Sequence, residues 1–264
     1  MTKQPLVSVV IPTYERVKLT LQAVLSVLDQ QYSEFEIIVV DDGSSEETQK
    51  QLKSMLPAGV IFISLPHSGL PAVARNAGIA SAKGEWIAFL DSDDIWNPDK
   101  LSKQMETVLA GNFDCVSSNF LLDSGAGHPD SEIFKTLRVN LKTMLRSNQI
   151  VNSSVMVRKA VITAVGGVCA SHNVRGVEDY ATWLRILSKY KWAHIVEPLG
   201  TYSTSQLEGI KVSRESSHFG RIHALIDFMG WQHSQGSKLI AARLILRLFS
   251  QSLITIRKLS LIHI

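Results

Sequence analysis

Trp86-Ile-Ala-Phe-Leu-Asp-Ser-Asp-Asp94 is an apolar run that ends abruptly at three carboxylates within four positions. Like charges at this spacing repel each other by about 1 kcal/mol per pair in water, and by more where the dielectric constant falls. A cation would offset that repulsion, and carboxylates such as Asp91 and Asp93 are the hard oxygen ligands that suit Mg²⁺ or Mn²⁺. The alternative, equally compatible with this stretch alone, is a solvated turn that caps the next helix.

The composition is that of an ordinary globular protein. The chain has 264 residues, of which 45% are hydrophobic and 19% are charged, enough for one α/β domain with an appendage. A net charge of +3 without a Lys/Arg run argues against nucleic acid as a partner. Cys115 and Cys169 lack C-x-x-C spacing, and 1–5 lead directly into an apolar run, so we expect reduced thiols and a cytoplasmic protein.

Strand and helix patterns alternate through the first part of the chain. Short β-branched runs, typical of buried strands, are followed by apolar residues at helical spacing. Short links between them favour an α/β fold with a mostly parallel central sheet flanked by helices. The expected strands are Val7–Ile11, Glu36–Val40, Val60–Ser64 and Trp86–Leu90, and the expected helices are 17–28, a helix from about Glu46 capped by Ser44 or Ser45, and Ala72–Ala82.

Polar clusters follow three of these expected strands. They are Pro12-Thr-Tyr-Glu-Arg16, Asp41-Asp42-Gly43 and Asp91-Ser-Asp-Asp94. Ligands of open parallel sheets bind beyond the carboxyl ends of the strands. We therefore expect the three clusters to converge on one binding site.

The remaining chain predicts a second half and a tail. We expect a helix at Asp99–Leu109, a strand at Asp114–Leu122, a loop at Asp123–Asp130, a helix at Val177–Tyr190 behind Gly166-Gly167, and an extended segment at Trp192–Tyr202. One domain would cover about 1–210, divided into halves of about 1–97 and 98–210. A helical C-terminal region would follow over 211–258.

The end of the chain carries two further expectations. Residues 238–258 are apolar, but a basic stripe interrupts them. They would make a poor membrane-spanning helix and a better interfacial one. Such a helix would contact the cytoplasmic face of the plasma membrane peripherally. A helix packed on the domain or on a second subunit fits these residues equally well. Leu259-Ser-Leu-Ile-His-Ile264 resembles a translated sequencing adapter, so we expect the natural chain to continue differently past Lys258.

Five motifs occur in an order that identifies a family. They are Val9-Val-Ile-Pro-Thr-Tyr14, Ile38-Val-Val-Asp-Asp-Gly-Ser44, Ala74-Arg-Asn-Ala-Gly78, Phe89-Leu-Asp-Ser-Asp-Asp94 with its DXD motif, and Glu178-Asp-Tyr180 after Gly166-Gly167. From Val7 to about Tyr202 the chain resembles the inverting glycosyltransferases of family two, which have the GT-A fold.

The resemblance implies a metal-dependent transferase that uses Mg²⁺ or Mn²⁺. A nucleoside diphosphate sugar, UDP- or dTDP-linked, would donate its sugar with inversion to a hydroxyl of a glycan or a lipid-linked acceptor, in cell-envelope or surface polysaccharide synthesis. The Gln-x-x-Arg-Trp motif of processive synthases is absent, which argues for non-processive transfer. The alternative is a catalytically silent sugar-nucleotide-binding subunit of a membrane glycan assembly complex.

Residue roles follow from the resemblance and from side-chain chemistry. Asp93 is the expected metal ligand, with Asp91 on the metal or the ribose. Asp179 is the expected general base, against the alternative of an exposed acidic first turn of a helix. Glu178 and Tyr180 would contact the acceptor. The residues expected to bind the nucleotide sugar are Pro12, Thr13, Tyr14, Glu15, Asp42, Arg75, Asp91 and Ser92.

Some of these roles leave an alternative open. Asp42 would accept the imide N–H of a uracil or thymine base, although a helix-capping turn would also use a carboxylate here. Arg75 would contact the diphosphate or form a surface salt bridge. Asp94 would bind ligand or cap the helix after Pro98, and Trp96 would stack on a sugar. Glu15 departs from the family, which often has Asn at this position.

Overall fold

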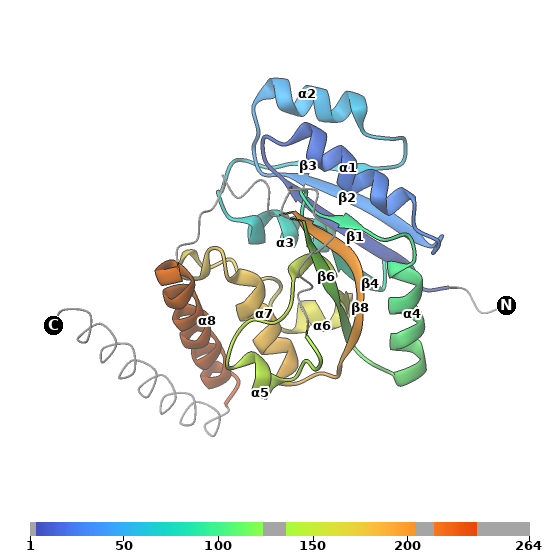
Figure 1. The fold of residues 1–264 in the computed structure, drawn as a ribbon. Coiled ribbons are helices and arrows are strands. Elements are labelled where there is room, and N and C mark those ends of the chain that lie inside the picture. Colours follow the sequence, from blue (N-terminus) through green and yellow to red (C-terminus); the bar gives the residue numbers. More distant parts are fainter. Residues whose placement is uncertain (1–3, 124–135, 204–213, 237–264) are drawn as a thin grey trace.

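A single mixed sheet forms the centre of the computed structural model, which describes residues 4–123, 136–203 and 214–236 (Figure 1). The strand order is β3-β2-β1-β4-β7-β6-β8-β5. The strands are β1 (Val7–Thr13), β2 (Phe35–Asp41), β3 (Ile61–Ser64), β4 (Trp86–Phe89), β5 (Ile95–Trp96), β6 (Cys115–Asp123), β7 (Met156–Arg158) and β8 (Trp192–Ser203). The expected α/β fold with a central sheet flanked by helices is therefore confirmed.

The two halves of the sheet differ in strand direction. Strands β3, β2, β1 and β4 are all parallel, as the alternating pattern predicted. In the second half, β7 is antiparallel to both β4 and β6, and β5 is antiparallel to β8, while β6 and β8 are parallel. The second half therefore mixes strand directions, whereas the first half is purely parallel.

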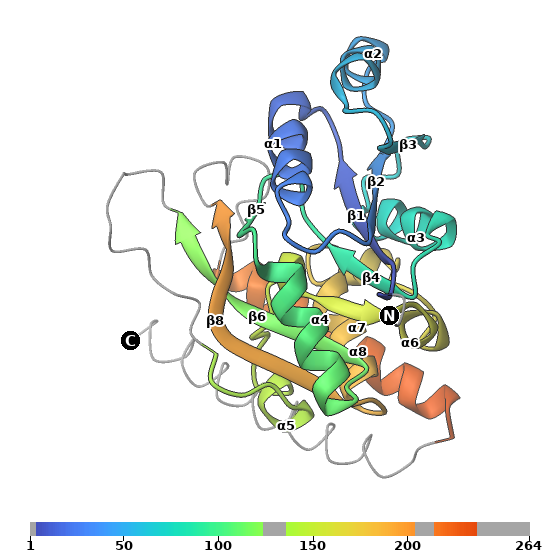
Figure 2. The ribbon, with the colours of Figure 1, turned by 90° about the vertical axis from the view of Figure 1, so that its right-hand side faces the viewer.

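Helices cover both faces of this sheet (Figure 2). Helices α1 and α4 pack on one face, where Val24 and Leu101 are fully buried, and α3, α6, α7 and α8 pack on the other. The helices are α1 (Val17–Leu28), α2 (Glu46–Met55), α3 (Pro71–Ser81), α4 (Lys100–Gly111), α5 (Leu141–Met144), α6 (Lys159–Ala164), α7 (Glu178–Leu187) and α8 (Arg214–Ser234), with 3₁₀ turns η1 (Asn152–Ser154) and η2 (His172–Val174).

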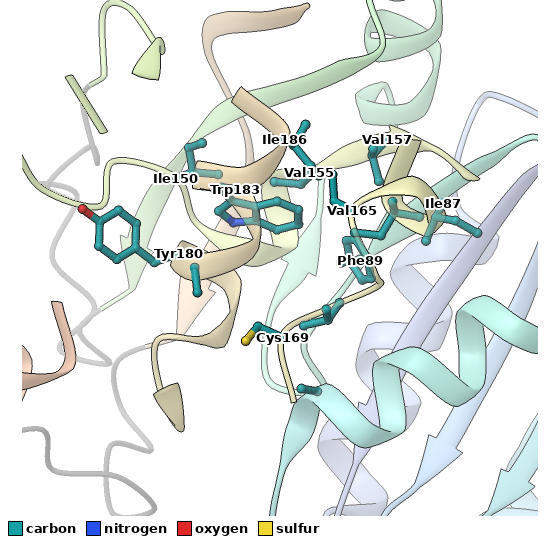
Figure 3. Packing of buried hydrophobic residues seen from close by; sticks show 14 of the residues in the cluster. Ile87, Phe89, Ile150, Val155, Val157, Val165, Cys169, Tyr180, Trp183 and Ile186 are labelled. Carbon is teal, nitrogen blue, oxygen red and sulfur yellow. The ribbon is translucent and has the colours of Figure 1, made fainter. Parts of the chain in front are cut away.

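Helix α7 is fixed in the core by an aromatic side chain, which holds its first turn in place. The ring of Trp183 is fully buried, 5.8 Å from the ring of Phe89 on β4 and 5.6 Å from that of Trp192 on β8 (Figure 3). Burying an indole of this size stabilises the fold by several kcal/mol, on the order of 3–5 by truncation. Because Trp183 lies one turn after Asp179, its packing determines where that carboxylate is presented.

Local features of the sequence explain how two helices begin. Pro71 occupies the first turn of α3, where its missing N–H costs nothing. Ser45 rather than Ser44 caps α2, with its hydroxyl accepting from the N–H of Thr48. Cys115 and Cys169 are both free and buried.

Parts of the sequence-based expectations lie outside the described residues. These are the loop after Asp123, most of the region 211–258 including the apolar stretch 238–258, and the final hexapeptide. Within the residues that are described, no helix is both long enough and apolar enough to span a membrane.

The third motif joins the two halves of the fold. Asn76 on α3 pairs its side-chain amide with the backbone of Val168, donating to its carbonyl at 2.8 Å and accepting from its N–H at 2.8 Å. Gly167, next to it, has φ of +77°, and a Cβ added there would lie 2.6 Å from the Asn76 Oδ1. Gly78, two residues after Asn76, packs directly on the side chain of Val10 of β1. The motif therefore holds the loop before α7 against α3.

Gly167→Ala should destabilise the protein more than Gly59→Ala. Both residues have positive φ, but nothing lies within 4 Å of a Cβ added at Gly59. We expect a loss of about 1 kcal/mol for Gly59→Ala from backbone strain alone, and of about 2–4 kcal/mol for Gly167→Ala. Urea unfolding of the two variants measures the difference, and equal losses would refute the close packing of Asn76 on this loop.

Candidate active site

The acidic loop after β4 is held by arginine side chains. Arg75 donates from Nη2 to Asp91 Oδ1 at 2.7 Å, and Arg16 donates from Nη1 to Asp93 Oδ2 at 2.7 Å. Asp94 is buried and accepts a hydrogen bond from the Ser153 hydroxyl at 2.5 Å. Two guanidinium groups thus offset part of the charge that the sequence concentrates here.

Asp94 does not have the capping role considered for it. Helix α4 begins after Asp99, whose side chain makes no capping hydrogen bond, while Asp94 is engaged with Ser153. The reason is that the chain turns at β5 before α4 begins, which separates Asp94 from the helix.

The charge of the remaining acidic pair stays incompletely balanced. Burial, followed by the neighbouring Asp91 carboxylate, raises the pKa of Asp93 above its usual value, although Arg16 opposes this. A divalent cation would offset both the burial of Asp93 and the repulsion from Asp91, because it favours the ionised form of each carboxylate.

Arg75 connects the two halves of the molecule through a buried bridge. Besides Asp91, its Nη1 donates to Glu178 Oε1 on α7 at 2.8 Å, and only 5% of Arg75 is exposed. Burial alone lowers the pKa of this guanidinium, but Asp91 and Glu178 outweigh it and raise the pKa. The surface salt bridge considered for Arg75 is therefore wrong, and its ion pairs lie in the interior.

Asp179 lies in the first turn of α7, beside this bridge. Its Oδ1 accepts from the N–H of Tyr180 at 2.7 Å, and Asn148 Nδ2 lies 3.5 Å from its Oδ2. Burial and then the neighbouring Glu178 raise the pKa of Asp179 to about 7, while Arg75 lowers it. A carboxylate with such a pKa can take up a proton near neutral pH.

Tyr202 on β8 shows that the acidic groups share one neighbourhood. Burial raises the pKa of its phenol to about 12, and the carboxylates of four aspartates add to this shift: Asp94, Asp91, Asp93 and Asp179. Asp91 and Asp179 also act on each other directly. The structure thus brings the acidic loop after β4 close to the first turn of α7, because Arg75 bridges Asp91 to Glu178, the neighbour of Asp179.

Asp42 lies at the end of β2, under the loop that precedes α3. Its Oδ1 accepts from the N–H and the hydroxyl of Ser68 at 3.0 and 2.6 Å, and its Oδ2 accepts from the N–H of Gly69 at 2.9 Å. A Cβ added at Gly69 would lie 3.8 Å from Arg175 Nη2, just before α7. Asp42 therefore holds a loop that borders the second half of the molecule. Because its carboxylate oxygens already accept these hydrogen bonds, binding a nucleotide base is not the sole role of Asp42.

Tyr14 and Glu15 follow β1 at the same edge of the sheet. The Tyr14 ring stacks on the His67 ring with centroids 4.3 Å apart. Glu15 has φ of +53°, and its carboxylate accepts from the hydroxyl of Thr48 at 2.6 Å and from the N–H of Ser45. The Thr48 hydrogen bond, followed by that of Ser45, lowers the pKa of Glu15. Asn tolerates positive φ better than Glu, which gives a physical reason for the Asn that the family resemblance led us to expect at this position.

Two aromatic residues do not fit the sugar contacts expected for them. Tyr180 is 1% exposed, and its hydroxyl donates to the carbonyl of Met144 at 2.6 Å. Trp96 is 3% exposed and packs under the ammonium group of Lys100. Tyr180 packs in the core beneath α7, and Trp96, on the edge strand β5, is covered by Lys100, so both rings are buried and closed to a sugar.

The other expected contact residues lie at the same edge. Thr13 is buried, with its hydroxyl 2.6 Å from that of Thr20, and Ser92 is also buried. Pro12 is half-buried at the end of β1. Sequence reasoning missed Asn152, Ser153 and Tyr202, since none of them lies within the polar clusters and only the fold brings them there, and it gave Arg16 no role of its own.

The donor set fits a divalent cation only with help from a ligand. Across residues 4–123, 136–203 and 214–236, no group of three or more His, Cys, Asp or Glu side chains could hold a metal ion. Mg²⁺ and Mn²⁺ sites in phosphate-binding enzymes commonly use one or two carboxylates together with substrate phosphate oxygens. Asp91 and Asp93 supply that number of carboxylates.

Comparison with known proteins establishes the family. Residues 8–153 match the model of glycosyl transferase family 2. The chain belongs to this family. The Escherichia coli UDP-Glc:α-D-GlcNAc-diphosphoundecaprenol β-1,3-glucosyltransferase WfaP is 31% identical to it over 198 residues, covering 75% of this chain and 76% of WfaP.

Two further comparisons support this family 2 glycosyltransferase assignment and its fold. TuaG of Bacillus subtilis, named for teichuronic acid biosynthesis, is 33% identical over 189 residues, covering 70% of this chain and 73% of TuaG. The crystal structure of S. aureus TarS 1–349 in complex with UDP is similar with a TM-score of 0.66 at 21% identity, covering 93% of this chain and 72% of TarS. The GT-A fold expected from the sequence is thereby confirmed.

Replacing Arg75 should destabilise this glycosyltransferase strongly. Arg75→Gln leaves the carboxylates of Asp91 and Glu178 without their buried partner, and we expect a loss of about 3–5 kcal/mol in the free energy of unfolding. Adding Glu178→Gln should restore part of that loss, because one of the two orphaned charges is removed. Urea unfolding of both variants measures the effect.

Arg158→Gln serves as the control, because it removes a guanidinium paired with the exposed Glu85. We expect that change to cost less than about 1 kcal/mol. Similar losses for Arg75→Gln and Arg158→Gln would contradict the buried bridge.

Proposed function

We propose that this family 2 glycosyltransferase moves a sugar from a nucleoside diphosphate sugar to an acceptor hydroxyl with inversion. Asp179 is the general base, Asp93 and Asp91 bind a divalent cation with the diphosphate, and Arg75 joins the two groups. The observation that carries the proposal is the buried bridge of Arg75, which bonds to Asp91 Oδ1 at 2.7 Å and to Glu178 Oε1, next to Asp179, at 2.8 Å.

The metal site is proposed from its donor set. Asp93 keeps a raised pKa despite its ion pair with Arg16, so the loop has room for more positive charge. When bound there, Mg²⁺ or Mn²⁺ would act as a Lewis acid that stabilises the negative charge of the leaving diphosphate. Arg16, partly exposed beside Asp93, is placed to contribute a further positive charge to the same leaving group.

The base follows from the position and environment of Asp179. Inversion requires a general base on the side of the sugar opposite the leaving group, and a carboxylate can serve as one. Asp179 belongs to α7, whereas the acidic loop follows β4, so the two approach from different elements. Glu178 is bound to Arg75 and to the N–H of Gly176 at 2.7 Å, which leaves Asp179 as the freer of the two adjacent carboxylates.

The substrate class is proposed from the relatives. UDP-Glc and a diphosphoundecaprenol-linked acceptor appear in the name of WfaP, and TarS was crystallised with UDP. A UDP-linked or dTDP-linked donor and a lipid-linked glycan acceptor follow by analogy, in cell-envelope or surface polysaccharide synthesis. Such an acceptor would keep the protein at the membrane surface. Pro12, Thr13, Tyr14 and Asp42 are proposed to border the base of the donor.

Asp179→Asn should abolish transfer while leaving nucleotide binding intact. We expect kcat to fall by about 10²–10⁴-fold, the contribution of a positioned general base, with the affinity for UDP changed less than threefold. In the wild type, the rate should rise with pH up to about 7 and then level off, because a base with a raised pKa is protonated and inactive below it. Transfer assays over a pH series, with UDP binding measured by calorimetry, provide the data.

The control for this variant is Glu46→Gln, which removes a carboxylate from the first turn of α2. Like Asp179→Asn, this variant loses a favourable interaction between a carboxylate and the helix dipole, but it does so away from the site. It should therefore leave kcat unchanged. Full activity of Asp179→Asn would eliminate Asp179 as the base. If the wild type bound UDP tightly but transferred no sugar from any donor, the alternative of a catalytically silent binding subunit would be favoured.

Asp93→Asn should remove the effect of Mn²⁺ on nucleotide binding. In the wild type we expect UDP to raise the melting temperature more with Mn²⁺ than with EDTA, because binding to the native state stabilises it. The variant should show the same small shift under both conditions. Asp99→Asn, which changes an aspartate on the other side of β5, should behave as the wild type. A Mn²⁺ effect that survives in Asp93→Asn would exclude Asp93 as a ligand.

A further inference from the structure

Two side chains outside the acidic motif hold the loop that follows β4. They belong to the 3₁₀ turn η1 (Asn152–Ser154). The antiparallel pairing of β4 with β7 explains their position, because the segment that precedes one strand must lie beside the segment that follows the other. Residues far apart in the sequence, and invisible to any local motif, therefore meet at the tip of β4.

Asn152 fixes one oxygen of Asp91. Its Nδ2 donates to Asp91 Oδ1 at 2.9 Å, the same oxygen that accepts from Arg75. Asp91 Oδ2 accepts no hydrogen bond from any residue that the structure describes. Because one carboxylate oxygen is held by two donors, the orientation of the other is determined.

Ser153 fixes the loop at two further points. Its hydroxyl accepts from the backbone N–H of Asp91 at 2.9 Å and donates to Asp94 Oδ2 at 2.5 Å. A hydroxyl has one proton to donate, so its donation to the Asp94 carboxylate leaves its lone pairs free for the Asp91 N–H. Ser153 is fully buried, so bulk solvent does not compete for these contacts.

The end of the loop is bound to the same turn. The indole N–H of Trp96 donates to the carbonyl of Ser153 at 2.8 Å, and the N–H of Phe89 donates to the carbonyl of Val155 at 3.1 Å. The segment from Phe89 to Trp96 is thus attached to η1 and its continuation at the start, in the middle and at the end. Asp93, the residue proposed to bind the metal, lies in the middle of this attached segment.

We infer that Asn152 and Ser153 are positioning residues that orient Asp91 and the loop of Asp93 for the divalent cation. This inference rests on the metal role proposed above. Mg²⁺ and Mn²⁺ tolerate little deviation in ligand geometry, so loss of the groups that orient carboxylate ligands weakens binding, typically by 10–100-fold. The same loss should change nucleotide binding little when no metal is present.

Ser153→Ala tests this inference against a matched control in the same turn. Ser154 is also fully buried, but its hydroxyl donates to the carbonyl of Val151 at 2.7 Å and contacts nothing in the acidic loop. Ser154→Ala therefore reproduces the removal of a buried hydroxyl from η1 without releasing Asp91 or Asp94.

The measurement is Mn²⁺ binding at saturating UDP, followed by the loss of the free Mn²⁺ signal in electron paramagnetic resonance. We expect the apparent dissociation constant for Mn²⁺ to rise 10–100-fold in Ser153→Ala and to stay within threefold of the wild type in Ser154→Ala. UDP affinity in EDTA should stay within threefold in both. Asn152→Ala, which removes one contact to Asp91, provides a second variant if Ser153→Ala does not fold.

Each outcome has a definite meaning. Wild-type Mn²⁺ affinity in folded Ser153→Ala and Asn152→Ala would overturn the inference while leaving the proposed metal site standing. Equal weakening of UDP with and without Mn²⁺ would also overturn it, since that marks general damage to the fold. A wild type that binds no Mn²⁺ with UDP would overturn both the inference and the metal role, whereas the transfer assay tests the base independently.

Discussion

The buried guanidinium of Arg75 is the interaction on which the rest of the site depends. It bonds to Asp91 at the end of β4 and to Glu178 at the start of α7, and so joins the two halves of the sheet at their common edge. A buried ion pair adds little net stability, because desolvation offsets most of the attraction, but removal of one member is costly. The bridge therefore acts mainly to specify how α7 sits over the acidic loop, and with it the position of Asp179.

The surroundings of this bridge give neighbouring carboxylates different tasks. Glu178 forms an ion pair with Arg75, while the burial of Asp179, followed by the charge of Glu178, keeps the pKa of Asp179 high. Asp91 is held by Arg75 and Asn152, while burial and then Asp91 keep the pKa of Asp93 raised despite its ion pair with Arg16. In each acidic pair, one carboxylate (Glu178 or Asp91) is held by Arg75. The other (Asp179 or Asp93) is the one to which the proposed function gives the role of base or metal ligand. Such divergence between adjacent carboxylates is the pattern expected where one site must bind a cation and also accept a proton.

Several motif residues that suggest ligand contacts are committed to the fold. Asn76 pairs with the backbone of Val168, Asp42 accepts three hydrogen bonds from the loop before α3, and Glu15 binds the first turn of α2. The Asn76 contact holds the loop before α7 against α3, and the contacts of Asp42 and Glu15 hold the loops at the carboxyl ends of β1 and β2. The motifs thus identify the family through residues that build the site as well as through residues proposed to react in it.

The sequence by itself determined the parallel half of the sheet, the helices between its strands and the acidic strand ends, because these depend on local periodicity and on short links. It also determined which carboxylates to consider. Only the tertiary structure decided their partners: Arg75 turned out to be a buried bridge, Tyr180 a core residue, and Ser153 a support of the acidic loop. The physical reason is that β7 runs antiparallel to β4, and contacts between segments so far apart in the chain leave no periodic signal in either one.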